Sequence, residues 1–300
     1  MGFFQAVFNL CLALWYIMEA LVKLFIPWSW RSRKDVAGEI VLVTGAGSGM
    51  GRLIAVEFAK RNATVVLWDV NSSGNQETAQ MIKAFDGNAS SYTVDVSSAE
   101  EVYEAAAKVK DEVGDVTILV NNAAVVTGKS LLDCPDHMIK RTMDVNATAH
   151  FWILKAFLPA MMANNKGHIV TVVSLAGYLP RRNLVDYCAS KFAAVGLHRT
   201  LRLELQLGGY DGIEMTLVNP AYVKTGMFAG MGGTAMAPEY VVSKIMDAVL
   251  LNEKLLCVPA SGYRTILLSY ITPEKLDLRN QRKSGMATRM DTFVGRSKNK

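Results

Sequence analysis

Residues 40–51 read Ile40-Val41-Leu42-Val43-Thr44-Gly45-Ala46-Gly47-Ser48-Gly49-Met50-Gly51, an apolar run that passes directly into a glycine-rich turn. The apolar run is typical of a strand buried on both faces of a parallel sheet. From Arg52 to Lys60, apolar residues recur at helical spacing. A strand, a glycine turn and a helix in this order are the setting of a dinucleotide-binding loop. The stretch therefore predicts an α/β fold with a nucleotide site at this turn.

The spacing of the glycines assigns them different tasks. Gly45 permits the tight turn, Gly49 lets a pyrophosphate approach the backbone, and Gly51 lets the helix pack on the strand. Ser48 and Met50 lie between them, and the start of the helix faces the phosphates. For the glycine cluster on its own, a glycine-rich surface turn is the alternative interpretation.

An acidic residue favours the nucleotide interpretation. Asp69 follows the apolar run 63–68, about twenty residues past the glycines, where a carboxylate binds the hydroxyls of the adenosine ribose. A carboxylate there repels a 2′-phosphate, and Ser48 stands where a basic residue would help to hold one. Both observations favour NAD over NADP. The alternative for Asp69 is an ordinary turn residue at a strand end.

A second motif carries proton chemistry. Tyr187 and Lys191 are four residues apart, and Ser174 precedes the tyrosine by thirteen residues. Positions four apart share one face of a helix, so the lysine ammonium would lie near the phenol and lower its pKa from about 10. A tyrosine tuned in this way acts as a general acid or base. Ser174, arriving from a neighbouring strand, would hold the reacting oxygen.

Together these motifs resemble the short-chain dehydrogenase/reductase family, over roughly residues 39–270. The resemblance implies a single Rossmann-type doubly wound parallel sheet with helices on both faces. It also implies a catalytic tetrad of Asn146, Ser174, Tyr187 and Lys191, in which Asn146 holds a water that links Lys191 to solvent. The expected cofactor-binding residues are Gly45, Ser48, Gly49, Met50, Gly51, Asp69, Asp95, Val96, Asn122, Tyr187, Lys191, Val223 and Thr225. The sequence departs from the family at Ala124 and Ala221, where glycine is usual.

Longer runs, such as residues 113–122 and 191–196, are similar to a membrane-associated branch of retinol dehydrogenases and lipid-droplet 17β-hydroxysteroid dehydrogenases. The resemblance implies an NAD-dependent oxidoreductase that interconverts a lipophilic alcohol and its carbonyl. Residues 226–238 carry no charge and contain three methionines, which suits a mobile apolar lid over a retinoid, a steroid or a long-chain alcohol. Two alternatives remain open: an NADP-linked retinal or carbonyl reductase, and a lipid-droplet scaffold with a vestigial site.

The chain is expected to have three parts. Residues 1–35 form an apolar anchor with a basic flank, residues 36–272 the catalytic domain, and residues 273–300 a basic tail. Basic residues after the anchor keep that side cytosolic. With the family resemblance, this places the catalytic domain on the cytosolic side of the endoplasmic reticulum membrane, a lipid droplet or both. The alternative for the anchor is a helix packed on the domain's own surface. The apolar stretch 255–272 is expected either to dip into a membrane interface or to form the last strand and a surface helix.

Charge and cysteine usage limit the partners. The formal net charge is +5, but the charges are unevenly distributed. The chain after residue 263 contains nine Lys and Arg and three Asp and Glu, and the first 35 residues contain four Lys and Arg and two Asp and Glu. The part between is therefore acidic, which argues against nucleic acid and suits basic ends on an anionic membrane. The four cysteines are isolated, so we expect no metal site and a reducing compartment. By resemblance, a homodimer could form through helices near 136–163 and 187–207.

Overall fold

The computed structural model describes residues 2–26 and 28–295, and the chain divides into two compact units between Asp35 and Val36. The first unit contains the helix α1 (Phe3–Phe25) and a short 3-10 turn, η1 (Trp28–Trp30). Within the described residues, the structure contains no helix with the length and apolar character needed to cross a membrane.

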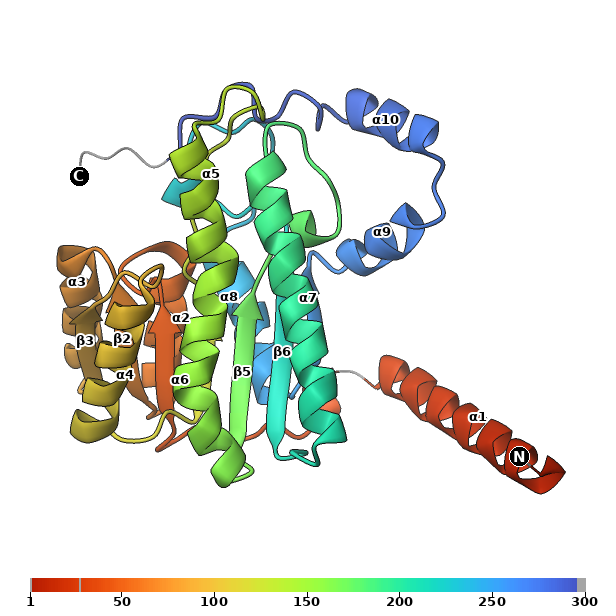
Figure 1. Ribbon diagram of the computed structural model, residues 1–300, viewed down its shortest axis with the longest axis horizontal. Helices are drawn as coiled ribbons and strands as arrows, with labels where there is room; N and C mark the ends of the chain where they lie inside the picture. The colour runs from red at the N-terminus through yellow and green to blue at the C-terminus, as the bar shows by residue number, and fades with distance from the viewer. Residues whose placement is uncertain (1, 27, 296–300) are drawn as a thin grey trace. The chain divides into compact units, whose positions relative to one another are not determined.

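The second unit is built on one sheet of seven parallel strands (Figure 1). The strands are β1 (Ile40–Thr44), β2 (Thr64–Asp69), β3 (Ala89–Thr93), β4 (Ile118–Asn121), β5 (Gly167–Val172), β6 (Ile213–Pro220) and β7 (Leu255–Val258). Their spatial order is β3-β2-β1-β4-β5-β6-β7. This arrangement confirms the predicted doubly wound fold.

Helices cover both faces of the sheet, with α4, α6 and α7 on the face toward the viewer in Figure 1 and α2 and α8 behind it. Their bounds are α2 (Gly49–Ala59), α3 (Ser72–Lys83), α4 (Ala99–Glu112), α5 (Asp136–Met143), α6 (Ala149–Ala163), α7 (Val185–Leu207) and α8 (Pro238–Leu250). Because both faces are covered, the central strands are apolar throughout: Val41, Leu42 and Val43 of β1 are fully buried.

The strand order places a crevice at one edge of the sheet. From β1 the chain proceeds outward to β2 and β3 on one side, and then returns to continue from β4 on the other. At such a switch point the connections leave in opposite directions from the carboxyl ends of two adjacent strands. Thr44 ends β1 and Asn121 ends β4, so the glycine turn and the stretch after Asn121 border the same crevice.

A single turn of π-helix, η2 (Asp144–Thr148), joins α5 to α6 and contains Asn146. One-turn π insertions inside helices are frequently found at functional sites, because the extra residue redirects the side chains around it. Here the inserted turn places Asn146 in the interior, with no solvent-exposed surface.

The C-terminal part of the chain returns to the sheet. The apolar stretch 255–272 forms β7 followed by the surface helix α9 (Ser261–Ser269), and α10 (Glu274–Lys283) follows. Residues 286–295, which we call the C-terminal strap, then pack against the second unit, with Met290 only 4% exposed. The residues after 272 therefore belong to the same compact unit as the sheet.

Candidate active site

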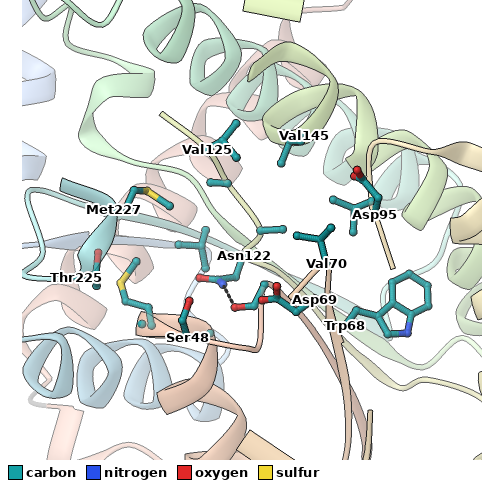
Figure 2. Close-up of a pocket in the computed structure, with 18 of the residues that line it drawn as sticks. Ser48, Trp68, Asp69, Val70, Asp95, Asn122, Val125, Val145, Thr225 and Met227 are labelled. Carbon is teal, nitrogen blue, oxygen red and sulfur yellow. Dashed lines mark hydrogen bonds between the residues drawn. The ribbon is translucent and has the colours of Figure 1, made fainter. Parts of the chain in front are cut away.

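A cleft of about 950 Å³, including its open mouth, lies at the carboxyl edge of the strands. Figure 2 shows Trp68 and Asp95 at one end, Thr225 and Met227 at the other, and Asn122 between them. Its walls come from the glycine turn, the ends of β2, β4 and β5, and α7. Of the expected cofactor-binding residues, the cleft is lined by Gly45, Ser48, Gly49, Met50, Gly51, Asp69, Asp95, Val96, Asn122, Tyr187, Lys191 and Thr225. Val223 lies instead in a neighbouring pocket.

The glycine turn has the geometry that its sequence predicts. Gly45 and Gly49 have positive φ angles of +68° and +55°, which side chains rarely adopt. A Cβ on Gly51 would lie 2.1 Å from the carbonyl oxygen of Gly45, so only glycine allows α2 to begin this close to β1. The first turn of α2 thus directs its free backbone N–H groups into the cleft, where an anionic group would be stabilised.

Asp69 is fixed beside this turn by two backbone donors. Gly47 N donates to Oδ2 at 2.8 Å, and Asn71 N donates to Oδ1 at 2.8 Å. The nearest cation of the turn, Arg52, donates to the Gly47 carbonyl at 2.6 Å and pairs with Glu77 at 2.9 Å. The carboxylate therefore contributes the negative charge at this end of the cleft, while the Arg52 guanidinium is engaged elsewhere.

Asn122 connects two strand ends. Its Nδ2 donates to the Thr44 carbonyl at 2.9 Å, and its backbone N donates to Thr44 Oγ1 at 2.9 Å. Asp95, at the Trp68 end of the cleft, accepts hydrogen bonds from the backbone N and the hydroxyl of Ser97. These contacts hold the cleft walls in one geometry before any ligand binds.

Tyr187 and Lys191 lie on one face of α7, as their spacing predicts. The Lys191 ammonium is 5.6 Å from the centre of the Tyr187 ring, and it donates to the Val172 carbonyl at 3.4 Å. Both side chains are buried, and burial lowers the pKa of Lys191 to about 8.

The expected lowering of the Tyr187 pKa is wrong. Burial raises the pKa of Tyr187, and a hydrogen bond with the Ser174 side chain, which lowers the pKa, offsets only part of that effect. Sequence spacing places a cation near the phenol, but the cost of placing a phenolate in the interior is larger than the gain from these neighbours.

Ser174 faces a second, smaller pocket of about 600 Å³ that adjoins the cleft. Tyr187, Thr225, Met50 and Val173 border both cavities. The Ser174 hydroxyl accepts from Ala176 N at 3.1 Å and lies 3.3 Å from the Pro220 carbonyl. The remaining walls are mostly apolar or aromatic: Leu175, Ala176, Leu184, Pro220, Ala221, Tyr222, Val223 and Phe228, with Arg181 as the charged exception.

Asn146 does not line either cavity, and its side-chain amide makes three hydrogen bonds. Its Oδ1 accepts from Val125 N at 2.8 Å, while Nδ2 donates to the Val125 carbonyl at 2.9 Å and to Ser190 Oγ at 3.0 Å. Ser190 Oγ in turn donates to the Tyr187 carbonyl at 2.7 Å. The side chain of Asn146 therefore braces the stretch after β4 against the first turn of α7.

Several cleft residues escaped the sequence analysis. Arg141 of α5, Val125 and Val145 line the cleft, as do Trp68 and Met227. Trp68 had a usable signal, because it immediately precedes Asp69 at the end of β2. Arg141 and Val145 had none, since only the path of α5 and η2 across the cleft brings them there.

The residues present fit a dinucleotide. The glycine turn lies at the N-terminus of α2, and the absence of side chains at Gly45 and Gly51 leaves its backbone close to the cleft, where a pyrophosphate would bind. The carboxylate of Asp69 lies beside the turn, where it would bind a ribose. The cleft continues from there to the buried tyrosine and lysine.

Comparisons with known proteins agree with this geometry. A sequence model of the family described as short chain dehydrogenase matches residues 39–234. Epidermal retinol dehydrogenase 2 of Mus musculus is 45% identical over 289 residues, covering 94% of this chain and 93% of that protein. Estradiol 17-beta-dehydrogenase 11 of Mus musculus is 48% identical over 263 residues, covering 87% of each.

Solved structures show the same fold. A short chain dehydrogenase/reductase from Burkholderia phymatum, in complex with NAD, aligns with a TM-score of 0.73 and 24% identity over 82% of this chain and 96% of that one. A metagenomic short-chain oxidoreductase, in complex with NADP, aligns with a TM-score of 0.65 and 28% identity over 75% and 98%. The resemblance seen in the sequence is thereby confirmed: the chain belongs to the short-chain dehydrogenase family.

Proposed function

We propose that the protein is an NAD-dependent oxidoreductase that interconverts a lipophilic alcohol and its carbonyl. The observation that carries the proposal is the position of Tyr187, which borders both the nucleotide cleft and the apolar pocket that contains Ser174. The relatives of this chain support the substrate class, because their names refer to retinol and estradiol.

NAD held in the cleft would supply the hydride acceptor for the alcohol carbon. Ser174 Oγ holds the alcohol oxygen, and Tyr187, as the phenolate, takes the hydroxyl proton. Lys191 supplies the positive charge behind the phenol, and Lys191, Val223 and Thr225 are the residues that would hold the nicotinamide end of the cofactor. The Asn146 side chain braces this arrangement through Val125 and Ser190, and a water on Asn146 remains part of the proposal.

The pocket favours an apolar substrate. Apart from Arg181, Ser174, Thr225 and two tyrosines, its lining offers only hydrocarbon, sulfur or backbone. The pocket also shares its Tyr187 wall with the cleft, so an alcohol in it would reach the phenol without leaving an apolar environment. A retinoid, a steroid or a long-chain alcohol satisfies both conditions.

NAD is preferred because the ribose end of the cleft carries a carboxylate. Asp69 holds its position through two backbone hydrogen bonds, and Arg52 is engaged with Gly47 and Glu77. A 2′-phosphate would meet this carboxylate, and the guanidinium of Arg52 beside the glycine turn is already bonded. If NADPH bound more tightly than NADH, the protein would be an NADP-linked carbonyl reductase instead.

A lipid surface is the proposed partner of both ends of the chain. The apolar side chains of α1 are largely exposed, and around α9 Leu267, Tyr270 and Ile271 are 69–74% exposed. Basic residues of α10, among them Arg282 and Lys283, lie nearby in sequence and suit anionic headgroups. We place the protein on the endoplasmic reticulum membrane or lipid droplets, with its catalytic domain in the cytosol, and fractionation of a tagged chain tests this.

A homodimer through α6 and α7 belongs to the same proposal. Phe151 of α6 and Phe192 and Leu203 of α7 are about half exposed, as expected for side chains that a partner covers. Size-exclusion chromatography with light scattering distinguishes a monomer of 32.8 kDa from a dimer.

The decisive experiment combines NAD with a panel of retinol, a steroid alcohol and straight-chain alcohols. We expect turnover of at least one, and a loss of about 10²–10⁴-fold in kcat for Tyr187→Phe with unchanged NAD binding. No turnover of any alcohol, with normal NAD binding, would indicate a scaffold protein with a vestigial site. Normal turnover by Tyr187→Phe would exclude the proposed mechanism.

A further inference from the structure

The C-terminal strap, residues 286–295, is joined to the loop 226–236 by backbone hydrogen bonds. Gly232 N donates to the Arg289 carbonyl at 3.0 Å, and Val294 N and Gly295 N donate to the Ala229 carbonyl at 2.9 and 3.1 Å. The loop itself is closed at its base, where Val223 and Met236 form a bridge. The uncharged loop that the sequence identifies as a mobile lid is thus held from both sides.

Glycines make room for the strap at three points. A Cβ on Gly128 would lie 2.1 Å from Phe293 Cδ1, and one on Gly230 would lie 2.5 Å from the Thr292 carbonyl oxygen. A Cβ on Gly233 would lie 2.6 Å from the Arg289 guanidinium. The sequence suggests that the loop glycines provide mobility. The structure gives a steric reason for them, because a side chain at Gly230 or Gly233 would collide with the strap.

Aromatic rings connect the strap to the reacting tyrosine. The Phe293 ring lies 6.4 Å from the Phe228 ring, and the Phe228 ring lies 5.9 Å from the Tyr187 ring and 5.6 Å from the Tyr222 ring, all edge to face. Met290 is buried in the same cluster. Because Phe228 lines the apolar pocket and Phe293 packs behind it, Phe293 limits how far Phe228 can move outward.

An ion pair fastens the strap to the stretch before α7. Arg182 Nη1 lies 2.9 Å from Asp291 Oδ1 and donates to the Ala287 carbonyl at 3.0 Å. Asn183 Nδ2 donates to the same carboxylate at 3.3 Å, and the Arg289 guanidinium lies over the Tyr222 ring at 5.1 Å. These contacts join the strap to two walls of the pocket at once.

We propose that the C-terminal strap supports the outer wall of the substrate pocket from behind, and that Phe293 determines, through Phe228, how bulky an alcohol reaches Tyr187. The inference rests on the proposed function and adds a specificity-determining residue to it. Phe293 is a positioning residue, since it touches Phe228 and not the reacting atoms. The Arg182–Asp291 pair keeps the wall in place.

The first test compares a slim and a bulky alcohol, octanol and a steroid alcohol, in the full-length protein. In Phe293→Ala, the ratio of kcat/KM for the bulky alcohol to kcat/KM for the slim alcohol should rise about tenfold. Val294→Ala is the matched control, because its side chain is 77% exposed on the same strap. A ratio within twofold of wild type in Phe293→Ala, or an equal change in Val294→Ala, overturns the proposal.

The second test needs no turnover. Hydrogen exchange should show protected amides at Gly232 and Val294 in the wild type. Asp291→Ala should speed their exchange up to about fivefold, and the reversed pair Arg182→Asp with Asp291→Arg should restore protection. Unprotected amides at Gly232 and Val294 in the wild type would contradict the proposal that the strap is fastened to the loop 226–236. A wild type that is inactive on every alcohol would instead contradict the proposed function, whatever the exchange rates.

Discussion

The ammonium of Lys191 lies 5.6 Å from the centre of the Tyr187 ring, and neither group has appreciable contact with solvent. Burial opposes charge on both: it lowers the pKa of Lys191 to about 8 and raises that of Tyr187 above its ordinary value. The pair therefore favours two neutral groups more than isolated side chains would. Proton transfer by Tyr187 must work against this preference, which determines how the reaction responds to pH.

Alcohol oxidation should accelerate with pH between 6 and 8. The phenolate form of Tyr187 takes the proton, and its fraction grows about tenfold per pH unit below a raised pKa. Near pH 8 the slope should fall, because Lys191 begins to lose its charge there. Measurements of kcat/KM across this range test the expectation. The reverse reduction should change little between pH 6 and 8, because the neutral phenol that donates the proton is almost fully populated throughout. A flat profile for oxidation would contradict it.

Asp69→Asn should weaken the preference for NAD over NADP by roughly 10- to 100-fold, because a charged hydrogen bond to the ribose and the repulsion of a 2′-phosphate are both lost. The asparagine can still accept from Gly47 N, so the turn is retained. Titration of both cofactors by fluorescence measures the change. Glu104→Gln, an exposed position on α4 that leaves both Asp69 and Arg52 in place, is the comparison. An unchanged NAD preference in Asp69→Asn would refute the role of the carboxylate.

Gly51→Ala should abolish dinucleotide binding, since its Cβ would lie 2.1 Å from the Gly45 carbonyl oxygen and displace the glycine turn. Gly196→Ala, on α7, is the control, because a Cβ there has no neighbour within 4 Å. We expect the control to bind NAD normally and to gain up to about 1 kcal/mol of helix stability. Calorimetric titration separates the two, and full NAD affinity in Gly51→Ala would contradict the assigned geometry.

The free energy of unfolding should fall as the pH drops below about 6.5. Burial lowers the pKa of His150 and of His198 from 6.5 to about 3. Between these values the unfolded chain binds protons that the folded chain does not, so each histidine costs up to about 1.4 kcal/mol per pH unit. Urea unfolding at pH 7.5 and 5.5 measures this loss. His198→Gln should reduce this loss, and an unchanged loss in that variant would contradict the expectation.

The sequence was sufficient for those parts of the site that lie within one local unit. The glycine turn and Asp69 belong to a single strand–helix–strand unit, whose spacing is fixed by backbone geometry. Tyr187 and Lys191 are one helical turn apart, so their shared face follows from the helix period. The strands β1 and β2 could be located from the apolar runs 40–43 and 63–68.

The contributions that depend on packing could not be read from the chain. The sign of the Tyr187 pKa shift follows from burial, which is a property of the whole fold. The strap contacts the loop 226–236 although about sixty residues of sequence separate them. No periodic pattern in the sequence predicts this contact. Gly230 and Gly233 suggested mobility in the absence of the segment that fills the space beside them.

The place of the strap in the chain has a consequence for how the protein is made. Every residue that lines the nucleotide cleft precedes position 228, whereas Met290 and Phe293 are translated much later. Because domains generally fold as units, the compact unit that contains the cleft is complete only once the strap has been synthesised. The packing behind Phe228 is therefore added later in synthesis than the residues that line the cleft.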